Sequence, residues 1–144
     1  RWHPTQAEEL TPQERMLFDC VVKAPALPEL DHEDDLSVHL SNNNPEINVL
    51  YFGQSPLFIA ANTGKLGVVR LLLRWPHPRA IDVNLCSDAG ETPFLAACRG
   101  GHLDIVKALL QFEETDLNKK SADGRSALWE ASRNGHVKLL KYLL

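Results

Sequence analysis

Three segments of the chain repeat one pattern of glycines and hydroxyl residues at an interval of roughly 35 residues. The aligned columns are Gly53, Gly90 and Gly124; Ser55, Thr92 and Ser126; and Gly64, Gly101 and Gly135. A period of this size is typical of stacked supersecondary units, because one such unit cannot bury its apolar face alone. The repeat therefore predicts an array of similar units rather than a single globular core.

Each repeat begins with a turn followed by a helix. Asp123-Gly124 is a strong turn-forming pair, and the glycine of each first column permits positive φ. The hydroxyl residue that follows is a typical helix N-cap, and Pro56 or Pro93 then occupies the first helical position, where its missing N–H costs nothing. We expect a short first helix after every turn.

A second helix is predicted after the next glycine. The first helix carries small residues, at 60–61, 96–98 and 131–132, which permit a close neighbour. The glycines at 64, 101 and 135 fit the left-handed residue that ends a helix. Apolar residues then recur at helical spacing, namely Leu66, Val68, Val69, Leu72 and Leu73 in one repeat and Leu103, Ile105, Val106, Leu109 and Leu110 in the next.

The stretch GETPFLAACRGGHLDIVKALL, residues 90–110, resembles the ankyrin repeat. The segments Ile81-Asp82-Val83-Asn84 and Thr115-Asp116-Leu117-Asn118 are similar to the element that ends that repeat. The resemblance covers about residues 47–144, with repeats at 47–83, 84–117 and 118–144. It implies an all-α fold, a solenoid of stacked helix-turn-helix units with hairpin-like turns.

Two columns depart from the family pattern. The histidine of the first helix is replaced by Phe58, Leu95 and Trp129, so we expect no polar ladder there, and buried packing for the aromatic residues. His102 and His136 match the second histidine, where the first repeat has Lys65. For these histidines we expect caps or packing contacts rather than catalytic bases.

The N-terminal third predicts two more helices. Thr11 and Glu14 form a capping box, which predicts a helix over 12–23, and a short second helix is expected over 34–40 before a loop at 41–45. We expect residues 1–46 to form a divergent N-terminal capping repeat that shields one side of the stack. The alternative is a separate adaptor helix pair docked elsewhere.

The last helix ends the chain with apolar residues and no polar outer unit. Leu139, Leu140, Tyr142, Leu143 and Leu144 predict exposed apolar surface. We therefore expect a chain truncated at its C-terminus, whose edge meets further repeats or another molecule.

Composition narrows the partner class and the compartment. The net charge of −4 and the pI near 5.8 make nucleic acid an unlikely partner, because phosphates require a basic patch. Three cysteines without a CxxC pair indicate a reducing, intracellular location, cytoplasmic with the nucleus as an option. No apolar run reaches the length of a membrane helix, so membrane insertion is not expected.

Sequence motifs for chemistry are weak. His32-Glu33-Asp34-Asp35 with His39 is not HExxH, because position 36 is Leu, so it reads as a solvated acidic helix start. Cys98 lies among small residues and is expected to be a buried packing residue. We predict no catalytic, cofactor-binding or metal-binding residue, no cofactor, and no enzymatic activity.

The resemblance implies that binding residues lie in the turns and just before the helix-ending glycines. It predicts a protein–protein interaction module, a scaffold or adaptor, with its partner on the concave face. The candidates are Tyr51, Phe52, Gln54, Asn62, Asp88, Glu91, Arg99, Asp123, Arg125, Arg133 and Asn134, with Trp75 from a proline-rich loop. The expected partner is an extended or helical protein segment with an apolar part and an acidic part.

The sequence is also compatible with three other interpretations of function. One alternative is that the turn residues are merely solvated and bind no partner. The chain also suits the targeting or substrate-recruiting portion of a larger enzyme or secreted effector. A passive structural spacer would have no saturable partner.

Overall fold

The protein is described by a computed structural model that covers residues 11–24, 35–43, 46–75 and 81–144. Eight helices lie within these ranges. The only β-type pairing among the described residues is an isolated antiparallel bridge between Tyr51 and Gln54. The helices are α1 Pro12–Lys23, α2 Asp35–Asn43, α3 Pro56–Asn62, α4 Leu66–Arg74, α5 Pro93–Gly100, α6 Leu103–Leu110, α7 Ala127–Arg133 and α8 Val137–Leu143. The predicted all-α class is confirmed.

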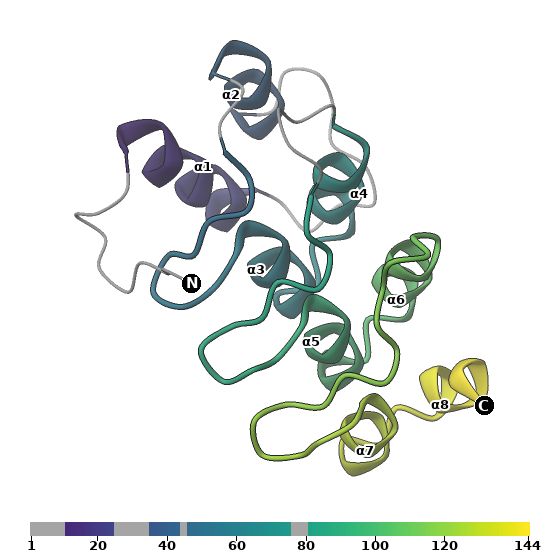
Figure 1. Ribbon diagram of the computed structural model, residues 1–144. Coiled ribbons are helices and arrows are strands. Elements are labelled where there is room, and N and C mark those ends of the chain that lie inside the picture. Colours follow the sequence, from purple (N-terminus) through teal and green to yellow (C-terminus); the bar gives the residue numbers. More distant parts are fainter. Residues whose placement is uncertain (1–10, 25–34, 44–45, 76–80) are drawn as a thin grey trace.

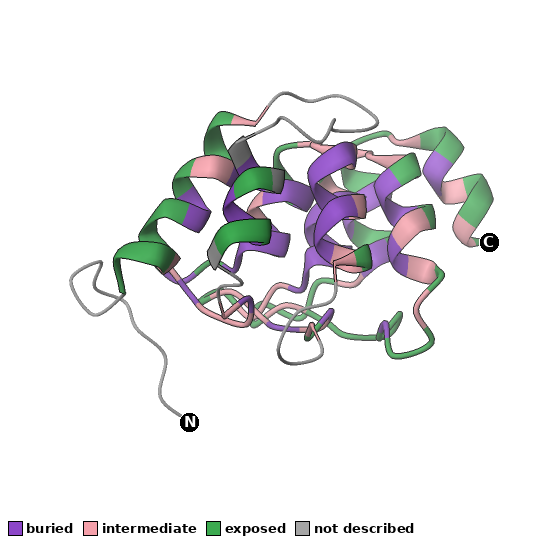
Figure 2. Cartoon of the chain, turned by 90° about the horizontal axis from the view of Figure 1, so that it is seen from above, coloured by how far each residue is buried: buried purple, intermediate pink, exposed green. Residues whose placement is uncertain are grey.

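The helices form two layers of a stack (Figure 1). Helices α1, α3, α5 and α7 lie side by side in one layer, and α2, α4, α6 and α8 lie in the other. The turns at 51–54, 87–91 and 121–125 project from the first layer; we call this side, with its helices, the inner face. Buried residues line the flanks where neighbouring helices meet, so one continuous core runs along the stack (Figure 2).

The helix starts follow the predicted capping chemistry. Thr11 N–H donates to Glu14 Oε2 at 2.8 Å, and Glu14 N–H donates to Thr11 Oγ1 at 3.2 Å, which completes the capping box. The hydroxyls of Ser55, Thr92 and Ser126 accept N–H bonds at 3.1, 3.2 and 3.2 Å. These bonds satisfy amides that a helix cannot satisfy itself.

Helix α2 is longer than predicted. Residues 41–43, expected in a loop, belong to α2, so that expectation was wrong. Leu36, His39 and Leu40 form its buried face, packed beside α1. Ser and Asn lower helix propensity by less than about 0.7 kcal/mol each, so polar residues alone do not end a helix.

The column of Lys65, His102 and His136 links each unit to the one before it. Lys65 Nζ donates to the carbonyl oxygen of Val21 at 2.9 Å. His136 Nε2 donates to the carbonyl oxygen of Arg99 at 2.8 Å. The two histidines make no side-chain cap bond, so their role lies between units: a polar ladder exists in the second histidine column although the first column lacks one.

Candidate functional site

The turns of the inner face are held in register with one another. Asp88 N–H donates to the carbonyl oxygen of Gly53, and Ala122 N–H donates to that of Ala89, both at 3.0 Å. The carboxylate of Asp88 also lies where a Cβ at Gly53 would be, so a larger residue at position 53 would displace it. Turns fixed in this way present side chains from a rigid scaffold, which suits macromolecular recognition.

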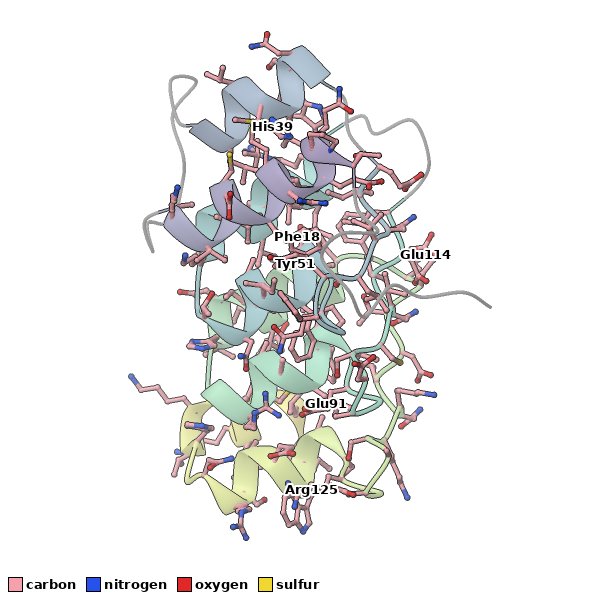
Figure 3. The ribbon with its side chains drawn as sticks, turned by 90° about the vertical axis from the view of Figure 1, so that its left-hand side faces the viewer. Phe18, His39, Tyr51, Glu91, Glu114 and Arg125 are labelled. Atoms are coloured by element: carbon pink, nitrogen blue, oxygen red, sulfur yellow. The ribbon has the colours of Figure 1, made fainter. Side chains whose placement is uncertain are left out.

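The first turn carries an aromatic cluster. The ring centroid of Tyr51 lies 5.0 Å from that of Phe18 and 4.5 Å from that of Phe52 (Figure 3). Phe18 is buried, whereas Phe52 is 64% exposed. The cluster thus extends from a buried ring in α1 to an exposed ring in the first turn.

The backbone of Phe52 is strained. A two-residue turn with positive φ at both positions joins Tyr51 to Gln54, with φ of 49° at Phe52 and 74° at Gly53. The later turns have one more residue, so only their glycine has positive φ. A left-handed non-glycine residue costs about 1–2 kcal/mol, so the exposed ring is held at an energetic cost.

In the middle unit, three predicted site residues bind one another. Arg99 forms an ion pair with Glu91 and donates through Nη2 to Asn62 Oδ1 at 2.8 Å. The side chain of Glu91 is 14% exposed and that of Arg99 is 33% exposed. The guanidinium of Arg99 is therefore already engaged within the chain.

In the last unit, Trp129 lies between two arginines. The guanidinium carbons of Arg125 and Arg133 lie 4.9 and 5.4 Å from its ring centroid. The expectation that Trp129 is buried between repeats was wrong: it is 41% exposed, whereas Phe58 in the same column is buried as expected. Arg125 reaches the exposed indole from the turn before α7, and Arg133 reaches it from the end of α7.

The remaining candidates are dispersed. Gln54 and Asp123 are exposed in their turns, and Asn134 donates through Nδ2 to the carbonyl oxygen of Glu130 at 2.8 Å. Trp75 follows α4 in the outer layer, half-buried against the core, so it does not join the inner face. The rest of its loop, and the acidic stretch at 32–34, lie outside the described residues.

Trp129 and Phe18 were missed as members of the site. The spacing contained a signal for Trp129, because Arg133 lies four residues after it on the same helix, a spacing that puts the two side chains on one helix face, while Arg125 lies in the turn before that helix. Phe18 carried no such signal, since its contact with Tyr51 depends on how α1 packs beside α3.

The helix pairs, their glycine-ended first helices and the ladder between units match a known family. The family model described as ankyrin repeats (3 copies) matches residues 30–120 and 77–144. The chain belongs to the ankyrin-repeat family. Ankyrin repeats are protein–protein interaction units, and the predicted solenoid fold is thereby confirmed.

Curated relatives carry the ankyrin segment inside much longer proteins. The probable E3 ubiquitin-protein ligase XBOS33 of Oryza sativa subsp. japonica is 38% identical over 62% of this chain and 16% of its own length. The E3 ubiquitin-protein ligase XBAT33 of Arabidopsis thaliana is 37% identical over 62% of this chain and 17% of its own length. Glycerophosphocholine phosphodiesterase GDE1 of Candida albicans is 37% identical over 60% of this chain and 7% of its own length. The matched segment thus spans about a sixth of the two ligases.

Burial shifts the pKa values of Cys98 and His102 in this ankyrin array. Burial, followed by the nearby Glu130, raises the pKa of the Cys98 thiol to about 12, so the thiol stays protonated and unreactive at neutral pH. Burial lowers the pKa of His102. The bond to the backbone of Asn62 acts in the opposite direction, and the nearby His136 lowers the pKa further. Within the described part of the chain, no helix has the length and apolar character needed to cross a bilayer.

Proposed function

We propose that this chain is a protein-binding module whose inner face holds a segment of a partner protein. The observation that carries the proposal is Phe52, an aromatic side chain that is 64% exposed on a backbone with positive φ. Burial of a ring in the core compensates for such strain, but exposure to water does not. Contact with a partner supplies the missing benefit, because aromatic residues are enriched among interface anchors.

The partner that fits has an apolar end and an acidic end. The aromatic cluster of Phe18, Tyr51 and Phe52 lies at the first turn, and Arg125 lies at the far end of the same face, with Glu91 between them (Figure 3). Because Arg99 is paired within the chain, the available cations are those of the last unit. An extended or helical segment can span these positions.

A second candidate function is recruitment on behalf of a larger protein. Relatives that share the ankyrin segment are named as ligases and a phosphodiesterase, and the segment is a small share of each. In this role the chain would recruit a substrate or target the protein to its site of action, while catalysis takes place in another part of the larger protein. The chain itself is proposed to be non-catalytic.

Site-specific photo-crosslinking tests the choice of face. A photoreactive residue at Gln54, exposed on the first turn, is expected to capture the physiological partner. The same residue at Lys138, exposed on outer helix α8, serves as the matched control. Capture from position 138 and not from 54 would move the interface to the outer layer and reject the proposal.

The substitution Phe52→Asn separates stability from binding. Asn-Gly is the preferred pair for a turn with two positive φ angles, so the variant should be more stable by about 1 kcal/mol. Its affinity for the captured partner should nevertheless fall, since the exposed ring is lost. Unchanged affinity, measured by titration calorimetry beside urea unfolding, would remove Phe52 from the interface.

We also propose that residues 1–46 act as a divergent capping repeat. The carbonyl oxygen of Val21 in α1 accepts from Lys65 as that of Arg99 in α5 accepts from His136, which supports the equivalence of α1 with a first helix. Deletion of residues 1–46 is expected to lower the melting temperature sharply, because α1 packs against α3 and the shared core would lose Leu17 and Val21. An unchanged melting temperature would favour the adaptor alternative.

A further inference from the structure

The three repeats place different side chains at the same inner-face positions. The positions are the last residue of the turn, the middle of the first helix and its end. They hold Gln54, Phe58 and Asn62; Glu91, Leu95 and Arg99; and Arg125, Trp129 and Arg133. The middle set contains one carboxylate and one guanidinium, whereas the last set contains two guanidinium groups. The last unit thus has an arginine where the middle unit has its carboxylate.

The middle unit shows what occupies the space between these positions. Glu91 reaches Arg99 across the first helix, and Asn62 accepts a second bond from the same guanidinium. In the last unit both arginines instead lie over Trp129, and among the described residues no carboxylate forms an ion pair with either one. We call Arg125, Trp129 and Arg133 the arginine clamp.

The nearby acids do not neutralise the clamp. Asp123 is exposed in the same turn and forms no ion pair there, and Glu130 is buried on α7, close to Cys98. Stacking on an indole shields one face of a guanidinium from water but leaves its N–H edge available for hydrogen bonds. The clamp therefore presents two oriented donor edges and a local charge without an internal counterpart.

We infer that the arginine clamp binds a side-chain carboxylate of an acidic partner segment, which takes the place that Glu91 takes in the middle unit. Arginine forks match carboxylates in a bidentate manner, and an interface excludes the water that weakens exposed pairs. The inference rests on the proposed function, since it names the chemistry of the partner at one end of the inner face. A nucleic acid is disfavoured, because the chain has a net charge of −4.

Nuclear magnetic resonance of the whole chain with a defined peptide tests the clamp. The probe is a short, N-acetylated and C-amidated peptide that carries glutamates between leucines, so that only side-chain carboxylates are present. Its two comparison peptides replace glutamate by glutamine or by phosphoserine. The glutamate peptide is expected to shift the indole N–H of Trp129 saturably, whereas the glutamine peptide should not.

Charge substitutions assign that binding to the clamp. Arg125→Glu installs the middle unit's carboxylate and should pair with Arg133, so the peptide's affinity should fall by at least about tenfold. Lys138→Glu makes the same change of charge on α8 and should alter affinity less than about twofold. Arg125→Lys keeps the charge but loses the fork, and an intermediate loss is expected.

Several outcomes overturn the inference. They are equal affinity for the glutamine peptide, no shift of the indole signal, equal losses for Arg125→Glu and Lys138→Glu, or binding of the phosphoserine peptide alone. If the clamp fails these tests while crosslinking from Gln54 succeeds, the protein-binding function stands and only the carboxylate chemistry falls. Crosslinking from Lys138 alone rejects the function itself, whatever the peptide does.

Discussion

The middle and last repeats have nearly the same sequence pattern but different surroundings. Phe94 on α5 is 1% exposed, while Leu128, at the same position on α7, is 43% exposed. Gly101 is covered by the ring of His136, while a Cβ at Gly135 would meet nothing within 4 Å. A repeat position therefore acquires its role from the unit stacked against it, and the pattern alone does not fix that role.

The same contrast extends to charge. Glu91 and Arg99 neutralise each other, whereas Arg125 and Arg133 share the indole of Trp129. One repeat thus uses its inner-face charges to hold itself and its neighbour Asn62 together. In the other repeat, both arginines contact Trp129 and neither forms an ion pair with a described carboxylate.

The largest expected difference between these repeats concerns their apolar column. Phe94→Ala should destabilise the protein by about 3–5 kcal/mol, because a buried ring leaves a cavity. Leu128→Ala should cost less than about 1 kcal/mol, since the side chain is already partly in water. Urea unfolding of both variants measures the difference, and similar losses would show that α7 is covered in solution.

A smaller effect is expected for the charged pair. Glu91→Gln should cost about 1 kcal/mol, since the pair is only partly buried and solvent screens it. Arg125→Gln should cost less than about 0.5 kcal/mol, because an exposed cation–π contact is the main loss. Thermal unfolding at low and high salt checks this: only the difference between Glu91→Gln and wild type should shrink with salt.

The smallest expected effect is the contribution of His102 to the pH dependence of stability. Because the folded-state pKa of His102 lies below its ordinary value, the unfolded chain binds a proton first as the pH falls. The stability contributed by neutral His102 is thus present above about pH 6.5 and is lost as the pH drops from there to the folded-state pKa. His102→Gln should flatten this part of the curve of melting temperature against pH; an unchanged slope would assign the pH dependence to other groups.

Much of the fold could be predicted because its signals are local. The capping box of Thr11 and Glu14 and the hydroxyl caps of the repeats depend on residues three apart, which sequence shows directly. The contacts of the candidate site were harder to predict from the sequence. The Glu91, Arg99 and Asn62 network joins two repeats, and Phe52 depends on a turn one residue shorter than the others.

The sequence by itself determined the repeating unit and its two helices, because helix caps, left-handed glycines and apolar periodicity act within a few residues, and the period of the repeat indicated that the units stack. Tertiary structure alone decided which equivalent side chains are buried, paired or exposed. Trp129 on the surface and Phe58 in the core occupy one sequence column. Their environments differ because burial and ion pairing depend on what a neighbouring unit places within a few ångströms.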